Sequence, residues 1–549
     1  MTMPKLVRFL LLCFVISKIT FAQSGHSLSG KTADLSLTAV GRQHHPIHTK
    51  SKEAQEYFDQ GITLVYGFNH EEAARAFEKA ARLDPASPMP LWGIALAVGP
   101  NYNLDVDAER EKKAYEAIQK ARKLAESAAR VEQDYVNALA ARYSGDANLD
   151  YKRLARDYAA QMRELAKKYP DDLDAATLYA ESLMNLNPWK LWSLDGAPGE
   201  NTDEIVRVLE SVLARDPMHA GANHYYIHAV EASSSPQRAL SSAARLEEMV
   251  PKAGHLVHMP SHIYSRVGYF SDAAESNVKA IAADRSYAKE AVQSGSLYDL
   301  MYHSHNEHFL AFAAAMEGRY TEARRAADTM AKRLLPHEDT MPMLESFLWT
   351  PIWVDLRFAK WQEILARPEP PPNRRVPHLM WRYSRTLAYA AQQQGAKADA
   401  EHALYTKEAS ALPSENPIGQ MNPNEAMLAV MNAVAAAKLD AGKGNAEAAI
   451  KYWRAAAEAQ DKLNYTEPPD WYYPVRESLG AALLASGKAK EAEEVFRDDL
   501  RRNPRNPRSL FGLKESLAAQ HLDNDAAWVQ REFEKSWKNA EAGLKIGDL

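Results

Sequence analysis

A fixed spacing of small, aromatic and proline residues near residue 60 constrains the fold of this chain more than any other feature. In the stretch Y-F-D-Q-G-I-T-L-V-Y-G-F-N-H-E-E-A-A-R-A-F-E-K-A-A-R-L-D-P, the pattern is formed by Gly61, Ala73, Phe77, Ala80 and Pro85. Small residues let two helices approach closely, an aromatic ring fills the space between them, and proline ends the second helix. The pattern therefore predicts a hairpin of two antiparallel helices.

The same spacing recurs near the other end of the chain. In E-S-L-G-A-A-L-L-A-S-G-K-A-K-E-A-E-E-V-F-R-D-D-L-R-R-N-P, the matching residues are Leu479, Gly480, Ala492, Phe496 and Pro504. From Glu53 onward the chain has helical periodicity rich in Ala and Leu, without a sustained alternating strand pattern. Both stretches resemble the 34-residue tetratricopeptide repeat. We therefore expect an all-α solenoid of roughly eight to ten helical hairpins, some of them degenerate.

Histidines in the middle of the chain follow the same period. His224 and His258 are 34 residues apart, and so are His228 and His262. Residues at positions i and i+4 lie on the same face of a helix. Two consecutive hairpins should therefore bring four imidazoles into one patch between neighbouring helices.

A longer hairpin extends this pattern of histidines to a third repeat. The predicted metal ligands are His224, His228, His255, His258, His262, His305 and His308. These positions correspond to the ones that line the concave groove of a tetratricopeptide solenoid. Imidazole nitrogen is a good ligand for zinc, copper or iron, so we expect a divalent metal site in that groove.

Two functions of different classes fit a histidine-lined groove. The first is an exported scaffold that binds a small molecule, a peptide or a protein in the groove. The second is a metal-dependent hydrolase or oxidoreductase, in which three histidines hold the ion, an open position binds water or dioxygen, and Glu181 or Glu231 is the catalytic base.

Two further hypotheses need no metal. Histidines together with Tyr225, Tyr226, Tyr264 and Tyr302 would bind an anionic ligand or peptide more strongly as the histidines become protonated. Alternatively, the C-terminal repeats alone bind a partner and the histidines stabilise the solenoid.

The start of the chain indicates export. Residues 1–22 carry Lys5 and Arg8, then an apolar run, and then the small-residue site Thr20-Phe21-Ala22, which predicts a secretory signal and a periplasmic or secreted protein. The single cysteine, Cys13, lies within this segment, so nitrogen and oxygen atoms must supply the ligands of any metal. No later segment is apolar for long enough to predict a membrane span. The formal net charge of −6 and the lack of a basic face argue against a nucleic-acid partner.

Composition divides the rest of the chain into four parts. Residues 23–50 form a polar arm that contains His44 and His45, whose participation in the site the sequence leaves open. Residues 51–365 are the expected N-terminal solenoid with the histidine-lined groove. Residues 366–377 are a stiff proline-rich break, and residues 378–549 are a C-terminal solenoid of ordinary repeats.

Several stretches resemble a family of exported bacterial tetratricopeptide proteins of undefined function. They include H-H-P-I-H-T, Y-G-F-N-H-E-E-A, L-W-G-I-A-L-A-V-G-P-N-Y-N, H-Y-Y-I-H-A-V-E-A and G-H-L-V-H-M-P-S-H-I-Y, and the resemblance covers nearly the whole mature chain. The chain departs from the family pattern at His48, where the family has serine. The resemblance implies export and a repeat fold, and it implies no reaction.

Overall fold

The protein is an all-α structure built from antiparallel helical hairpins. The computed structural model describes residues 43–104, 107–146, 149–291, 298–414 and 416–549. Consecutive helices pack against each other along the chain, which confirms the expected tetratricopeptide-like solenoid. The predicted signal, and the part of the polar arm before residue 43, lie outside the described residues.

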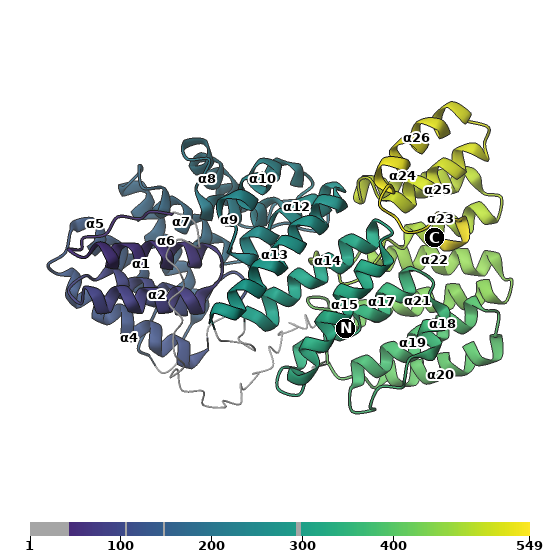
Figure 1. Cartoon of the computed structure of the whole chain (residues 1–549), viewed down its shortest axis with the longest axis horizontal. Helices are drawn as coiled ribbons and strands as arrows, with labels where there is room; N and C mark the ends of the chain where they lie inside the picture. Colours follow the sequence, from purple (N-terminus) through teal and green to yellow (C-terminus); the bar gives the residue numbers. More distant parts are fainter. Residues whose placement is uncertain (1–42, 105–106, 147–148, 292–297, 415) are drawn as a thin grey trace, which may run out of the picture.

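The helices of the first half end in a long helix that leads toward the middle of the molecule (Figure 1). They are α1 (Lys52–Tyr66), α2 (His70–Leu83), α3 (Met89–Val98), α4 (Ala108–Ala125), α5 (Arg130–Ala140), α6 (Tyr151–Lys168), α7 (Leu173–Met184), α8 (Thr202–Arg215), α9 (Ala220–Val230), α10 (Leu240–Met249), α11 (Gly254–His258), α12 (Pro260–Val267) and α13 (Phe270–Ala291).

The remaining helices follow a short π-helical turn, η2 (Asp299–His303). They are α14 (Ser304–Met316), α15 (Tyr320–Leu334), α16 (Glu345–Leu348), α17 (Thr350–Arg357), α18 (Trp361–Ala366), α19 (Arg375–Ala391), α20 (Gly395–Ser410), α21 (Asn424–Gly442), α22 (Ala446–Gln460), α23 (Arg476–Ala485), α24 (Ala489–Arg502), α25 (Pro507–Ala518) and α26 (Asp523–Ser536).

The aromatic residue of the repeat pattern packs as the sequence predicts. The ring of Phe77 lies between Gly61 on α1 and Gly93 on α3, where a Cβ atom on either glycine would be 2.5 Å from a ring carbon. Phe496 fills the same position between Gly480 and Gly512. A side chain larger than hydrogen would push the ring out, so glycine at these positions sets the distance between consecutive helices.

Helix α9, which carries two of the histidines, is buried along its whole length. Every residue from Ala220 to Val230 is buried, including His224 and His228. Pro260 follows α11 and begins α12, where its missing N–H is not needed by the first turn of a helix. These segments place five histidines in the interior of the first half.

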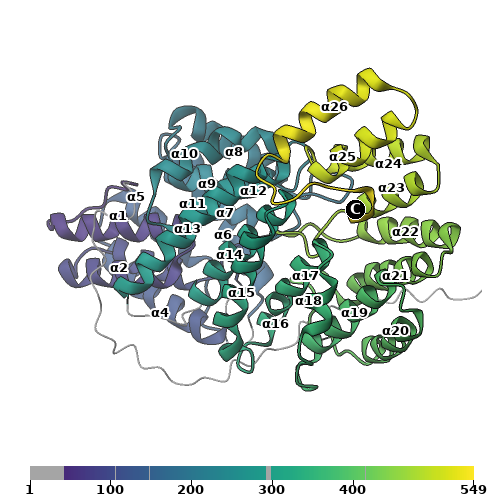
Figure 2. The same cartoon turned by 45° about the vertical axis from the view of Figure 1, so that its right-hand side comes forward.

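The two halves of the molecule meet near α14 and α15 (Figures 1 and 2). The guanidinium of Arg505 donates a hydrogen bond of 2.7 Å to the carbonyl oxygen of Val267, and the amide of Asn539 donates one of 3.0 Å to the hydroxyl of Ser271. The hydrophobic core of the second half includes Trp349 and extends to Leu549, so it spans the proline-rich segment 367–374 between α18 and α19. Among the described residues, no helix is both long and apolar enough to cross a membrane.

Candidate metal centre

Six of the seven predicted metal ligands lie together in the interior of the protein. They are His224 and His228 on α9, His255 and His258 on α11, His262 on α12, and His305 on α14. Five of them are at most 2% exposed, and His305 is partly buried. The repeat period therefore brings these side chains together from three successive hairpins.

The histidines do not line an open groove, which differs from the expectation. Aromatic rings cover them: the centroid of Phe68 lies 4.5 Å from that of His224, and the centroid of Phe309 lies 4.9 Å from that of His262. The ring of Tyr102 also packs beside the cluster, and it is buried. Residue spacing predicts which side chains share a face, but it does not predict what packs over that face.

The first group of three histidines joins α9 to α11. One ligand atom from each of His224, His228 and His255 lies within 4.8 Å of the other two. The Nε2 atoms of His224 and His255 are 3.2 Å apart, and Nε2 of His228 is buried without a hydrogen-bond partner. We call these three residues the first triad.

The second group joins α11 and α12 to α14. One ligand atom from each of His258, His262 and His305 lies within 4.8 Å of the other two. Nε2 of His262 is 2.7 Å from Nε2 of His258 and 3.4 Å from Nε2 of His305. We call these residues the second triad.

The opposite nitrogen of two imidazoles is held by a hydrogen-bond acceptor outside the triads. Nδ1 of His224 lies 2.6 Å from the backbone oxygen of Tyr66, and Nδ1 of His258 lies 2.7 Å from Oδ1 of Asn277. The amide nitrogen of Asn277 donates to the carbonyl of Ala273, which fixes the orientation of the amide. Because these oxygens can only accept, Nδ1 carries the hydrogen and Nε2 presents a lone pair to the triad.

Glu231, which follows α9, holds one histidine of each triad. Its Oε1 lies 2.8 Å from Nδ1 of His228, and its Oε2 lies 2.6 Å from Nδ1 of His262. Metal-binding histidines usually donate their second N–H to a carboxylate or carbonyl oxygen, which sets the tautomer and the ring orientation. Glu231 is in that orienting position for both triads.

The distances distinguish ligand contacts from hydrogen bonds. Two nitrogens bound to one tetrahedral zinc ion lie about 3.3 Å apart, since each Zn–N bond is about 2.0–2.1 Å. The Nε2 separations of 3.2 Å and 3.4 Å match this value, whereas the 2.7 Å between Nε2 of His258 and Nε2 of His262 is a hydrogen-bond length. The contacts of Glu231, at 2.6 Å and 2.8 Å, are also normal hydrogen-bond lengths.

Most of these imidazoles are neutral at physiological pH, and the main cause is burial. Burial and the neighbouring imidazoles hold the pKa well below its ordinary value for His224, His255, His258 and His305. Burial also lowers the pKa of His228 to about 3. The neutral form is the one that binds a metal ion.

His262 differs because two carboxylates lie beside it. Burial lowers its pKa, but Glu467 and Glu231 outweigh this effect and raise the pKa to about 10. In the metal-free protein, a proton on Nε2 of His262 can bridge the 2.7 Å to Nε2 of His258. A metal ion in the second triad would take the place of this proton.

Glu467 is a residue of this site that sequence reasoning missed. It lies in the segment 461–475 between α22 and α23, is 7% exposed, and contacts Nδ1 of His262. Burial and the neighbouring Glu231 raise the pKa of Glu467 to about 7. Its only sequence signal is the stretch Y-T-E-P-P-D-W, where prolines and aromatic residues interrupt the helical pattern of the C-terminal repeats.

Two other predicted residues lie outside the triads. Nδ1 of His308 is 3.2 Å from the amide nitrogen of Gln420, and the ring packs against Phe347 and Trp353. Glu181 is buried and accepts a hydrogen bond from Asn185. A ligand role for His308 and a catalytic role for Glu181 remain predictions.

The histidines of the arm belong to a different cluster. Nδ1 of His45 lies 2.8 Å from Oδ2 of Asp174, while Oδ1 of Asp174 accepts a hydrogen bond from the Tyr66 hydroxyl and lies 3.2 Å from Nε2 of His219. Burial raises the pKa of Asp174, but hydrogen bonds from His219 and His45 outweigh it and place the pKa well below its ordinary value. His44 instead contacts Asp59 at the surface. The arm is therefore anchored next to the metal centre through Tyr66.

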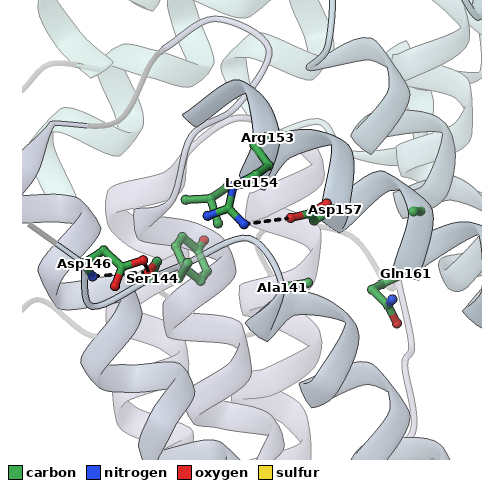
Figure 3. A pocket seen from close by; sticks show the side chains of 9 residues that line it. Ala141, Ser144, Asp146, Arg153, Leu154, Asp157 and Gln161 are labelled. Carbon is green, nitrogen blue, oxygen red and sulfur yellow. Dashed lines mark hydrogen bonds and ion pairs between the residues drawn. The ribbon is translucent and has the colours of Figure 1, made fainter. Parts of the chain in front are cut away.

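A surface pocket elsewhere contains none of the predicted site residues. It has a volume of about 490 Å³ and lies beside the end of α5 and the face of α6 (Figure 3). Its polar lining includes Ser144 with Asp146 and Arg153 with Asp157. It offers no imidazole and is distinct from the triads.

Comparison with known proteins identifies no family. No protein-family model matches the chain, and no curated protein is similar to it in sequence. Similar solved structures include Naa15/Naa10 bound to HypK-THB, at 12% identity over 89% of this chain and 90% of that chain, with a TM-score of 0.25. They also include the human IFIT1 dimer with m7Gppp-AAAA, at 12% identity over 89% and 91%, with a TM-score of 0.35.

Proposed function

We propose that this protein binds a transition-metal ion, namely zinc, copper or iron, at the buried histidine cluster of a helical-repeat scaffold. One observation carries the proposal. Nδ1 of four cluster histidines is held by acceptors outside the triads, while Nε2 atoms face one another at 2.7–3.4 Å. Because Glu231 holds Nδ1 of His228, Nε2 of this residue is a lone pair that is buried without a hydrogen-bond partner, and a bound cation removes the cost of burying it.

The donor set agrees with these metals. The cluster offers imidazole nitrogens and carboxylate oxygens, which are ligands for zinc, copper and iron alike. A calcium or magnesium site would instead be built from oxygen atoms.

The test is to measure metal in the purified full chain without a histidine tag. We expect bound zinc, copper or iron in the parent after reconstitution and a lower metal content in the variant His258→Ala/His262→Ala. The control is His48→Ala/His521→Ala, which removes two exposed histidines and should retain the metal. A parent chain that takes up no metal under these conditions would refute the proposal.

As part of this proposal, the protein is exported and acts in the periplasm or outside the cell, as a scaffold for a small molecule, peptide or protein. The signal-like residues 1–22 and the family resemblance support export. Helical-repeat solenoids present extended surfaces that suit such partners. Fractionation of cells that express the full chain tests the location, since export predicts a shortened protein outside the cytoplasm.

A second candidate function is metal-dependent catalysis, hydrolytic or oxidative. Three histidines on one ion leave a coordination position open for water or substrate, as in catalytic zinc sites. His305 is only partly buried, which gives the second triad a side that faces outward. Azide added to the cobalt-substituted protein should change the visible spectrum if a position is open. An unchanged spectrum would indicate a closed, structural site.

A further inference from the structure

The histidine cluster contains more ligands than a single metal ion can use. A tetrahedral ion takes four ligands, and the two triads together offer six imidazoles. With one ion, at least two of these imidazoles would bind no metal. A buried polar atom left without a partner is costly, so the surplus ligands need an explanation.

A six-coordinate ion does not account for all six histidines. Ligands on opposite sides of such an ion are about 4.2 Å apart, twice the metal–nitrogen bond length. All six ligand atoms would therefore fall within the 4.8 Å limit that defines each triad. In the described part of the chain, ligand atoms within this limit form the two triads separately, and the one group that mixes them is His228, Glu231 and His262.

The mixed group is better explained by hydrogen bonding than by a metal ion. Its contacts, 2.8 Å from Glu231 to His228 and 2.6 Å from Glu231 to His262, join a carboxylate oxygen to an imidazole Nδ1 and have normal hydrogen-bond lengths. It also uses the Nδ1 atoms, and binding through Nδ1 would remove the hydrogens that Glu231 accepts. Glu231 therefore joins the triads as a shared orienting carboxylate.

From these contacts we infer that the cluster holds two metal ions, one in the first triad and one in the second, with Glu231 orienting one histidine of each. This inference rests on the proposed metal-binding function and goes beyond it in number and assignment. His224, His228 and His255 bind one ion, and His258, His262 and His305 bind the other. The two sites lie side by side, with 5.5 Å between the ring centroids of His228 and His262.

The surroundings make the two sites unequal. The first triad is enclosed on α9 and α11, with Phe68 packed against it. The second triad has the partly exposed His305 and also contacts Glu467 from the second half of the chain. We expect the second site to exchange its ion faster, because it has the shorter path to solvent.

The test counts zinc ions in the full, untagged chain. The metal is removed with a chelator, zinc chloride is added in excess, and loosely bound zinc is removed before the metal content is measured. We expect two zinc ions per parent chain. His224→Ala/His255→Ala and His258→Ala/His305→Ala should each retain one, and the exposed-histidine control His48→Ala/His521→Ala should retain two.

The possible results separate this inference from the proposed function. One zinc ion in the parent, lost in both double variants, would overturn the two-site assignment and leave metal binding intact. No zinc in the parent would overturn both. If a double variant fails to fold by circular dichroism, titration of the parent with Co²⁺ decides: two spectral phases support two sites, and a single phase that saturates at one ion overturns them.

Discussion

The role of Glu231 gives the sharpest prediction about this site. Both of its carboxylate oxygens accept hydrogen bonds from imidazole N–H groups, one from His228 and one from His262. The substitution Glu231→Gln keeps the size and shape of the side chain. Its amide has one oxygen that accepts and one NH₂ group that only donates. The amide therefore accepts from only one of the two histidines. Nδ1 of His262 still contacts Glu467, whereas His228 without its acceptor can change tautomer, which turns its metal-binding nitrogen into an N–H donor.

The size of the effect follows from the number of hydrogen bonds that the substitution removes. Removing one outer hydrogen-bond partner of a metal-binding histidine weakens metal affinity by about 10–100-fold. This corresponds to about 1.4–2.7 kcal/mol of binding free energy. Because the amide still satisfies one histidine, we expect this loss at one of the two sites and a smaller change at the other.

Competition between the protein and a chromophoric zinc chelator measures this change. The matched control is Glu210→Gln, which alters a carboxylate that accepts hydrogen bonds from Tyr226 and Arg238 away from the histidines. Zinc affinity equal to that of the parent would refute the orienting role of Glu231. Loss of zinc from both sites would instead show that Glu231 is a direct ligand.

Three further predictions test the structure around the metal centre. Asp174→Asn removes the charged acceptor of His45, and we expect urea unfolding at pH 7 to show a loss of about 3–5 kcal/mol, as for other broken buried pairs. The difference in unfolding free energy between the parent and this variant should shrink as the pH falls below about 4. The lowered pKa of Asp174 stabilises the folded state fully only at a pH where the same carboxyl group is also ionised in the unfolded chain. Burial lowers the pKa of His70 to about 3. Between pH 6.5 and pH 3, a proton therefore binds to His70 in the unfolded chain but not in the folded protein. As the pH falls from 8 to 5, the unfolding free energy of the parent should decrease by about 2 kcal/mol more than that of His70→Phe. Equal decreases would contradict this explanation. Phe496→Ala empties the space between Gly480 and Gly512 and should cost about 3–5 kcal/mol in the same urea assay, whereas a cost below 1 kcal/mol would argue against the repeat packing.

The sequence predicts the fold well because the repeat pattern encodes the packing directly. Gly61 and Phe77 belong together since one provides the space that the other fills, and the structure shows this contact. The pattern does not encode how the degenerate repeats between its two clear copies close around one another. The contact between Glu467 and His262 therefore could not be found from periodicity, since the two residues lie in different halves of the chain.

The histidine spacing predicts that the ligands lie close together, but it does not predict which of them belong to the same triad. The offset of the longer hairpin places His255 and His305 at equivalent positions of two successive repeats, apart from the other histidines. In the structure, His255 instead faces His224, and His305 faces His262. Side chains on a helix point back toward its N-terminus, so a residue reaches the turn that precedes its own backbone position. Sequence offsets do not include this displacement or the break between α11 and α12 at Met259.

The repeat architecture explains how the interior can contain so many histidines. A single buried imidazole needs partners for both nitrogens, and apolar helices do not provide them. When successive repeats carry histidine at equivalent positions, each helix supplies part of a ligand set that its neighbour completes. The outer acceptors then come from elements packed around that set: the carbonyl of Tyr66 at the end of α1, Asn277 on α13 and Glu231 after α9. A metal ion bound to either triad would therefore connect neighbouring hairpins. Because the ion would bind only the folded chain, it would raise the free energy of unfolding by about 2.7 kcal/mol at a free-ion concentration 100 times the dissociation constant.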